Sequence, residues 1–183
     1  MNFWQGKLVR LRGVEPSDAE TFARWNLDSE MARDLDFVWP PVSLAQIKEH
    51  VEEISLRKLE GDEFTWIVED PTGTAVGQIR THHCDHRSGV FGYGLSVARE
   101  QRRRGYATEA ALLVLKYYFG ELRYQKCTVE VHANNEASVR LHEKLGFRRE
   151  GTLRRVVYTG GRYFDSHYYG LTREEWEQSP LRV

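Results

Sequence analysis

The sequence lacks the features that mark several large classes of protein. It has only two cysteines, Cys84 and Cys127, which lie far apart and form no CxxC pair. This excludes a disulfide scaffold and favours a reducing compartment. No run of about 18 apolar residues occurs anywhere, and residues 1–12 contain no apolar stretch long enough for a secretory signal. We therefore expect a cytoplasmic protein that does not associate with a membrane.

The chain also lacks an excess of charge of either sign. It carries 26 Lys and Arg against 27 Asp and Glu, with a pI of 6.7. A surface that binds long stretches of nucleic acid is usually clearly basic, so we expect no stable nucleic-acid partner. The 183 residues, 40% of them apolar, hold no repeat or low-complexity linker. This composition is typical of one globular domain that spans residues 1–183.

Strand and helix patterns alternate along the chain. Alternating apolar and charged residues predict a strand over residues 8–12, and capping patterns predict helices that begin after Pro16 and after Ser43. Periodicity and turn signals predict further strands over 63–69, 75–81, 91–97, 126–131, 153–158 and 163–171, and helices over 107–119 and 135–145. Antiparallel strands mixed with helices indicate an α/β or α+β fold built on one sheet.

A basic turn that contains a glycine separates the predicted strand 91–97 from the helix after it. Its sequence is Arg102-Arg103-Arg104-Gly105-Tyr106-Ala107-Thr108. Free amides and the helix dipole at a helix start favour an anion. The arginines add positive charge, and the small Gly105 and Ala107 let a ligand approach the backbone. The turn thus has the properties of a pyrophosphate cradle, although a solvated basic loop would have the same sequence.

Two other phosphate-binding patterns do not fit. The chain contains no GxxxxGK[ST] sequence, which excludes a P-loop. Gly92 and Gly94 are followed by Val97 where a dinucleotide fingerprint requires its third glycine, and by a charged turn where it requires a helix. Glycines inside a strand instead indicate a bulge or the close approach of a ligand.

The turn, which contains R-x-x-G-x-A, resembles the acetyl-CoA pyrophosphate loop of the GNAT acetyltransferase superfamily. Further on, the run Asn135-Glu136-Ala137-Ser138-Val139-Arg140-Leu141-His142-Glu143-Lys144-Leu145-Gly146-Phe147 resembles its second signature, N-x-x-S/A-x-x-L-Y-E-K-x-G-F. Residues 6–12 and 25–28 resemble the opening of the branch of ribosomal-protein N-terminal acetyltransferases, and residues 161–165 and 174–176 resemble its end. Spermidine N-acetyltransferases share much of this pattern.

The resemblance covers nearly the whole chain and implies the fold of that superfamily. This fold has a single mixed, mostly antiparallel sheet, flanked by helices and splayed around the cofactor. The resemblance also implies acetyl-CoA as co-substrate, without a metal. The pantetheine arm would pair with the backbone from Leu95 to Val97 and bind the side chain of Asn135, close to Ser138. The pyrophosphate would lie on Arg102, Arg103, Arg104, Gly105, Tyr106, Ala107 and Thr108.

Some of these residues have simpler interpretations. Asn135 could serve only as a helix cap, and we interpret Arg140 as a surface residue. The segment His82-His83-Cys84-Asp85-His86 carries metal-ligating side chains, but consecutive residues of a strand end point to opposite faces. We therefore expect a polar loop there and no metal site.

The resemblance suggests a catalytic pair. Glu130, on a strand face with Thr128 and His132, matches the position of the base in some N-terminal acetyltransferases, although an ordinary exposed glutamate would give the same pattern. His142 stands where the superfamily usually has a tyrosine that protonates the leaving thiolate. An imidazolium could supply that proton; alternatively, His142 is only a packed residue and water supplies it.

The acceptor that we expect is a primary amine, namely a peptide or protein N-terminus or a small amine. A polyamine, with a pKa of about 10.4, nearly requires a base, whereas an α-amine of about 7.7–8.0 does not. Spermidine-like or aminoglycoside-type acceptors and a non-catalytic acyl-CoA-binding module are the alternatives, and a homodimer stays open. Candidates for the acceptor wall, drawn from the first helices and the last hairpin, are Asp34, Asp36, Trp39, Glu63, Tyr93 and Tyr163, although a solvated surface has a similar composition.

Overall fold

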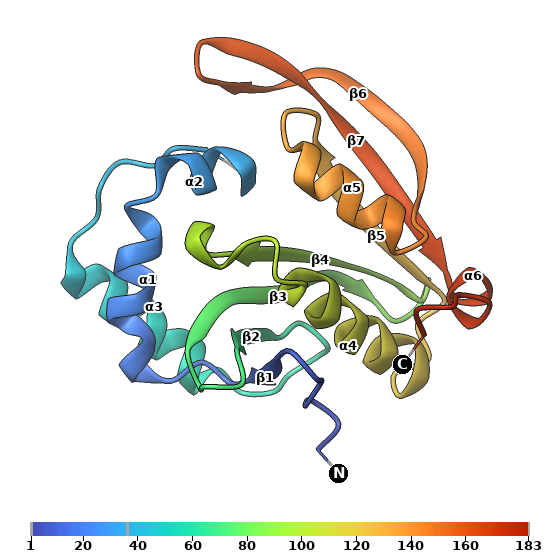
Figure 1. The fold of residues 1–183 in the computed structure, drawn as a ribbon, viewed down its shortest axis with the longest axis horizontal. Coiled ribbons are helices and arrows are strands. Elements are labelled where there is room, and N and C mark those ends of the chain that lie inside the picture. The colour runs from blue at the N-terminus through green and yellow to red at the C-terminus, as the bar shows by residue number, and fades with distance from the viewer. Residues whose placement is uncertain (1, 36, 183) are drawn as a thin grey trace.

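The computed structural model describes residues 2–35 and 37–182. One seven-stranded sheet has the order β1-β2-β3-β4-β5-β7-β6, in which β4 and β5 are parallel and the other neighbours antiparallel (Figure 1). The strands are β1 (Arg10–Arg12), β2 (Thr65–Glu69), β3 (Ala75–Asp85), β4 (Val90–Val97), β5 (Lys126–His132), β6 (Arg148–Thr159) and β7 (Arg162–Thr172). This confirms the expected mixed, mostly antiparallel sheet flanked by helices.

The helices cover both faces of the sheet (Figure 1). The helices are α1 (Ala19–Asn26), α2 (Ser29–Leu35), α3 (Leu44–Leu56), α4 (Tyr106–Gly120), α5 (Glu136–Lys144) and α6 (Arg173–Glu177), with short 3₁₀ turns at Pro16–Asp18 and Arg99–Gln101. Helices α1, α2 and α3 pack against one face of the sheet, and α4 and α5 pack against the other. None of the helices in the described ranges is long and apolar enough to cross a membrane.

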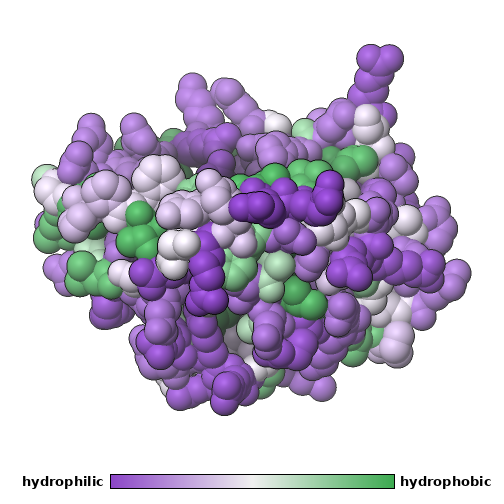
Figure 2. Space-filling model, turned by 90° about the horizontal axis from the view of Figure 1, so that it is seen from above, coloured by the Kyte–Doolittle hydropathy of each residue, from purple (hydrophilic) through white to green (hydrophobic). Residues whose placement is uncertain are grey.

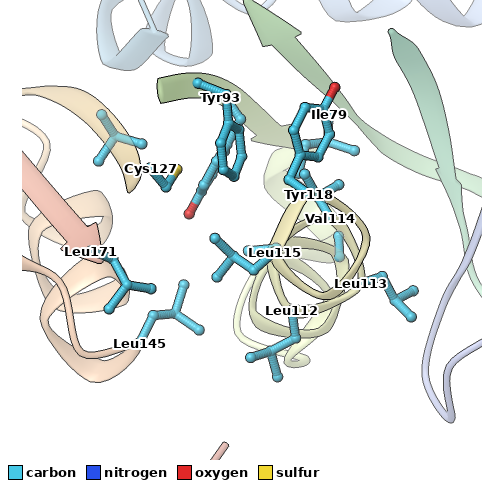
Figure 3. Packing of buried hydrophobic residues seen from close by; sticks show 14 of the residues in the cluster. Ile79, Tyr93, Leu112, Leu113, Val114, Leu115, Tyr118, Cys127, Leu145 and Leu171 are labelled. Atoms are coloured by element: carbon cyan, nitrogen blue, oxygen red, sulfur yellow. The ribbon is translucent and has the colours of Figure 1, made fainter. Parts of the chain in front are cut away.

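Two hydrophobic clusters hold the layers together. On one face, α4 buries Leu115 and Tyr118 against Ile79 of β3 and Cys127 of β5 (Figure 3). On the other face, α1 and α3 bury a smaller cluster against β2, made of Phe22, Trp25, Ile47, Val51 and Ile67 among others. Since α4 packs against the central strands, its first turn is held at a fixed place beside the end of β4.

The neighbouring strands β4 and β5 pair over a short length only. Their parallel pairing joins Val90, Phe91 and Gly92 to Lys126, Cys127 and Thr128. Beyond Gly92, β4 continues to pair with β3 as far as Val97, whereas its other edge no longer faces β5. The backbone groups on that edge are therefore available to another partner.

Four elements differ from the sequence prediction, one of them the short helix α6 (Arg173–Glu177), which was not expected. Helix α2 was not expected; it begins where the carboxylate of Asp28 accepts hydrogen bonds from Glu30 N and Met31 N, at 3.0 Å each. Strand β6 begins at Arg148 rather than at residue 153, because its first residues pair with β7 while their charged side chains stay exposed. Strand β3 continues to Asp85 through a register shift that begins after His82.

Candidate active site

A cavity of about 530 Å³ opens where β4 and β5 diverge and extends to the start of α4. The structure brings together at this first cavity all the residues that the sequence suggested for the cofactor and for proton transfer. Its lining includes Leu95, Val97, Arg102, Arg103, Arg104, Gly105, Tyr106, Ala107, Thr108, Glu130, Asn135, Ser138 and His142.

The basic turn has a backbone suited to an anion. Gly105 precedes α4 with φ +86° and Arg103 has φ +65°, both in the left-handed region. No side chain caps the helix at Gly105, so the first amides of α4 point out of the helix without a capping partner at that position. Arg102 is held by a bond of 3.3 Å from its Nε to the carbonyl oxygen of Val97. Arg103 and Arg104 are exposed, and their charges add to the dipole of α4.

A carboxylate on α4 anchors the N-terminal segment beside this turn. Glu109 accepts hydrogen bonds from the backbone amides of Lys7, Leu8 and Val9 at 3.0, 2.6 and 2.7 Å. A Cβ atom at Gly6 would lie 2.3 Å from Glu109 Oε2, so a side chain there would displace the Glu109 carboxylate from its present position. The first turn of α4 is thus fixed from both sides, by the sheet and by this segment.

Several buried polar atoms at the first cavity have no hydrogen-bond partner among the described residues. They include Gln101 Oε1, His132 Nδ1 and His142 Nε2. Buried polar atoms are rarely left unpaired in native proteins, because an unmade hydrogen bond costs about 1–3 kcal/mol. A polar ligand in the cavity would satisfy them, so the lining fits a long molecule with amide and phosphate groups.

Glu130 is held in place by two hydroxyl donors from β7. Ser166 Oγ donates to Glu130 Oε1 at 2.6 Å, and Tyr168 OH donates to Glu130 Oε2 at 3.1 Å. The register pairs Glu130 with Tyr168, which explains how both donors reach one carboxylate. Burial, together with this carboxylate, raises the pKa of Tyr168, so its hydroxyl remains a donor. Glu130 is therefore exposed but oriented.

The surroundings of His142 favour its neutral form. It is 5% exposed, and its Nδ1 lies 2.8 Å from the carbonyl oxygen of Ser138, so that nitrogen carries the hydrogen. Burial lowers the pKa of His142, against the opposing effect of the Ser138 carbonyl. The proposed acid requires an imidazolium, and the aromatic surroundings of Tyr93, Phe147 and Tyr169 disfavour that charge.

A second cavity, of about 880 Å³, lies on the opposite face of the sheet, between α3 and strands β2 to β4. It shares Gly94, Leu95 and Ser96 with the first cavity. The central part of β4 therefore forms a common wall of two cavities that open on different faces of the sheet. Viewed from above, the molecule presents a mostly hydrophilic face on which hydrophobic residues are scattered (Figure 2).

The candidates for the acceptor wall are not brought together. Glu63 lines the second cavity, but Trp39 and Tyr163 are 68% and 56% exposed and line neither cavity. Tyr93 instead turns toward the core beside Cys127 and Leu115 (Figure 3), where burial raises the pKa of its hydroxyl well above the usual value.

The remaining two candidates cannot be compared in the same way. Asp34 belongs to α2, and Asp36 lies outside the described residues. The first helices do contribute to the second cavity, whereas the last hairpin does not. Sequence reasoning missed Thr65, Gln78, Arg80 and Ser96, which line the floor of the second cavity. They come from three strands, and their signal was the placement of polar residues among apolar ones.

The expected polar loop at residues 82–86 was wrong, because most of it belongs to β3. Its side chains join β3 to the segment before β2. The Cys84 thiol donates to the Asp62 carbonyl oxygen at 3.2 Å, and His86 Nε2 lies 2.9 Å from Asp62 Oδ2. Within the described ranges, no group of three or more His, Cys, Asp and Glu side chains is placed to hold a metal ion.

Comparison with known proteins adds independent findings. Residues 9–148 match the model of the acetyltransferase (GNAT) domain family. The SPbeta prophage-derived uncharacterized N-acetyltransferase YokL of Bacillus subtilis (strain 168) is 42% identical over 97% of both chains. The putative ribosomal N-acetyltransferase YdaF of the same organism is 28% identical over 92% of this chain and 93% of its own.

A solved structure shows the same fold. The spermidine N-acetyltransferase from Vibrio cholerae, in complex with CoA and spermine, superimposes with a TM-score of 0.80 at 21% identity, covering 93% of this chain and 98% of its own. The family model covers more than half of the chain, and a close relative is aligned along nearly its full length. The chain therefore belongs to the GNAT acetyltransferase family.

Proposed function

We propose that the protein transfers an acetyl group from acetyl-CoA to the α-amine of a peptide or protein N-terminus, or of a small molecule, by direct attack. One observation carries this proposal: two cavities on opposite faces of the sheet share Gly94, Leu95 and Ser96. A donor in the first cavity and an acceptor in the second would meet at that wall. The CoA in the Vibrio cholerae structure of the same fold supports the choice of donor.

The first cavity has groups for each part of acetyl-CoA. The pyrophosphate would lie on the amides of the basic turn, beside Arg103 and Arg104. The amide-bearing pantetheine arm would pair with the edge of β4 that β5 leaves unpaired after Gly92. When bound, acetyl-CoA would supply an acetyl thioester, and the residues of the chain would orient it and exclude water.

Glu130 would remove the proton from the acceptor amine, directly or through water. Its two oxygens keep a fixed orientation because Ser166 and Tyr168 each hold one of them, and a carboxylate has further lone pairs for a third donor. Neutralising an α-amine at pH 7 costs about 1 kcal/mol, compared with about 4 to 5 kcal/mol for a lysine-like amine. An exposed carboxylate suits the easier deprotonation, which favours an α-amine.

The leaving thiolate, with a pKa of about 8.5, would take its proton from water. This follows from the neutral state of His142, whose Nδ1 hydrogen is already donated to Ser138. Protonation by water suffices for this step, since a thiolate is a far better leaving group than an alkoxide. The neutral form of His142 also keeps a non-catalytic acyl-CoA-binding module as the second candidate.

The test is a panel of amines incubated with protein and acetyl-CoA, with release of free thiol as the readout. The panel contains peptides with free N-termini, spermidine and an aminoglycoside. Thiol release with peptides supports the proposal, and release with spermidine alone contradicts the choice of acceptor. CoA binding without amine-stimulated release would identify the binding module.

A further inference from the structure

We propose that Arg80 binds a carboxylate of the acceptor, so that the substrate is an amine that carries a nearby acidic group and not a polyamine. This inference rests on the proposed function, because it assigns the second cavity to the acceptor. It comes from the position of Arg80 on the sheet, from an unpartnered hydroxyl beside it, and from the charges that surround both.

Arg80 stands beside the wall that the two cavities share. The register of the sheet aligns Thr65 of β2, Arg80 of β3 and Gly94 of β4 in one row across three strands. Residues in such a row point to the same face, about 5 Å apart. Gly94 has no atom within 4 Å of the place where a Cβ would stand, so the guanidinium has open space on that side. A carboxylate there would lie close to the reacting amine.

The next row supplies a hydroxyl without a partner. Ser96 pairs with Gln78 in the register, and both line the second cavity. Ser96 is only 6% exposed, and its Oγ has no hydrogen-bond partner among the described residues. A buried hydroxyl that faces a cavity is expected to bind a ligand atom. Together with the guanidinium and the Gln78 amide, it forms a set of donors of the kind that carboxylates accept.

The charges around the second cavity favour an anion as well. Its lining contains Arg57, Lys58 and Arg80 as cations, Glu53 and Glu63 as anions, and His50. None of the three cations forms an ion pair with a described residue. By contrast, Glu63 already accepts a long hydrogen bond of 3.4 Å from the Cys84 amide. With three cations against two anions, the lining has a small excess of positive charge, which disfavours a polyamine with two or more positive charges.

The carboxylate can come from two sources with the same chemistry. It can be the α-carboxylate of a free amino acid, or the side chain of an acidic residue near the N-terminus of a peptide. In both cases Arg80 can make a bidentate contact, which a lysine cannot reproduce. The arms of the experiment therefore include both sources, so that the measurement also identifies which of them the cavity accepts.

The experiment compares kcat/KM for matched acceptors. Three peptides share a free N-terminal serine and differ at the next residue, which is aspartate, asparagine or lysine; free glutamate and spermidine complete the panel. The wild-type protein is expected to prefer an acidic acceptor over its neutral match by roughly tenfold or more. If the protein prefers the aspartate peptide and does not acetylate free glutamate, the source is a peptide side chain. If it acetylates free glutamate and shows no preference among the peptides, the source is the α-carboxylate.

Variants assign the preference to one residue. Arg80→Gln should remove it, Arg80→Lys should keep part of it, and Arg80→Glu should shift it toward the lysine peptide. Arg87→Gln is the matched control, because Arg87 is exposed and lines neither cavity. Ser96→Ala should reduce the preference less than Arg80→Gln. Thermal unfolding of each variant verifies that it folds.

Two results would overturn the inference while leaving the proposed function intact. One is equal kcat/KM for the aspartate and lysine peptides in the wild-type protein together with no activity on free glutamate, and the other is an acidic preference that persists in Arg80→Gln. Spermidine as the best acceptor would contradict the inference directly. Absence of thiol release with every acceptor would contradict the proposed function itself.

Discussion

The buried hydroxyl of Ser166 on β7 donates a hydrogen bond of 2.6 Å to Glu130 Oε1 on the neighbouring strand β5. Ser166 is fully buried, whereas Glu130 is exposed beside the first cavity. A rigid strand pair thus fixes the orientation of a carboxylate that lines the first cavity. The orientation of Glu130 is a property of the sheet, not of a mobile loop.

If Glu130 is the base, its removal should affect acceptors according to their basicity. Glu130→Gln keeps the size of the side chain and removes its negative charge. We expect kcat/KM to fall about 10²–10⁴-fold for a lysine-like amine, and much less for an α-amine, which is more often neutral at pH 7. The measurement is steady-state thiol release with both amines. Equal loss for the two would indicate a structural role for Glu130.

Removing a donor should loosen the carboxylate without abolishing proton transfer. Ser166→Ala and Tyr168→Phe are each expected to lower kcat several-fold and to move the acidic limb of its pH profile, because each hydroxyl bonds a carboxylate oxygen. Tyr169→Phe is the matched control, since the Tyr169 hydroxyl contacts Glu143 and not Glu130. An unchanged pH profile in both test variants would exclude a positioning role.

The basic turn should contribute to affinity for the donor and not to folding. Arg104 is exposed, so Arg104→Gln is expected to raise the KM for acetyl-CoA about three- to tenfold, with an unchanged melting temperature. Arg123→Gln, at an exposed site outside both cavities, is the control. The KM values should converge as salt increases, because screening weakens exposed charges. A KM that does not respond to the substitution would separate the turn from donor binding.

The anchor at Glu109 should matter for stability. Glu109→Gln replaces a carboxylate that accepts three backbone hydrogen bonds with an amide that has one acceptor oxygen. We expect the free energy of unfolding to fall by about 1–3 kcal/mol, measured by urea denaturation. Because the same residues pack beside Gly105, affinity for CoA should fall as well. An unchanged unfolding midpoint would show that the segment is held by other contacts.

A partly buried ion-pair network at the edge of the sheet should make the stability of the protein depend on pH in the acidic range. Arg12 bonds Asp18 at 2.8 Å and also pairs with Glu69, which Arg10 contacts too. Burial alone would raise the pKa of Asp18 and Glu69, but the arginines outweigh it and hold both pKa values below normal.

The sign of the effect follows from that direction. Carboxyl groups with lowered folded-state pKa values stabilise the protein above their usual value of about 4, and the stabilisation disappears as pH falls through the folded-state pKa. The contribution of Asp18 and Glu69 to the urea midpoint should therefore be constant between pH 6 and 8 and be lost progressively below pH 5. Glu69→Gln should lower the urea midpoint at neutral pH and reduce the slope of the midpoint against pH below pH 5. A slope equal to that of the wild-type protein would contradict the assignment.

The residues that the sequence suggested for the cofactor line one cavity in the structure, and most of them come from two contiguous segments. The turn from Arg102 to Thr108 and the helix start at Asn135 each fold locally, so their spacing carries the information. Capping confirms this at Asn135, whose side chain accepts from Ser138 N at 2.9 Å. The overall sheet was predictable for the same reason, since most strands show alternation or turn signals.

The second cavity was not predictable, because it is assembled from distant segments. Arg80, Gln78 and Ser96 become neighbours only when the register of β3 and β4 is known. The neutral form of His142 is favoured by its burial among three aromatic rings, which no local pattern reveals. Helix α2 was missed because it is one short segment, whose only signal was the capping carboxylate of Asp28.

The central claim is that the donor lies in the first cavity and reaches the acceptor across the wall at Gly94. A crystal structure of the protein with CoA tests it most directly. We predict the pyrophosphate on the amides of residues 103–108, the pantetheine arm along residues 93–97, and the sulfur atom beside Gly94. CoA bound elsewhere, or a sulfur atom that does not face the second cavity, would contradict the account.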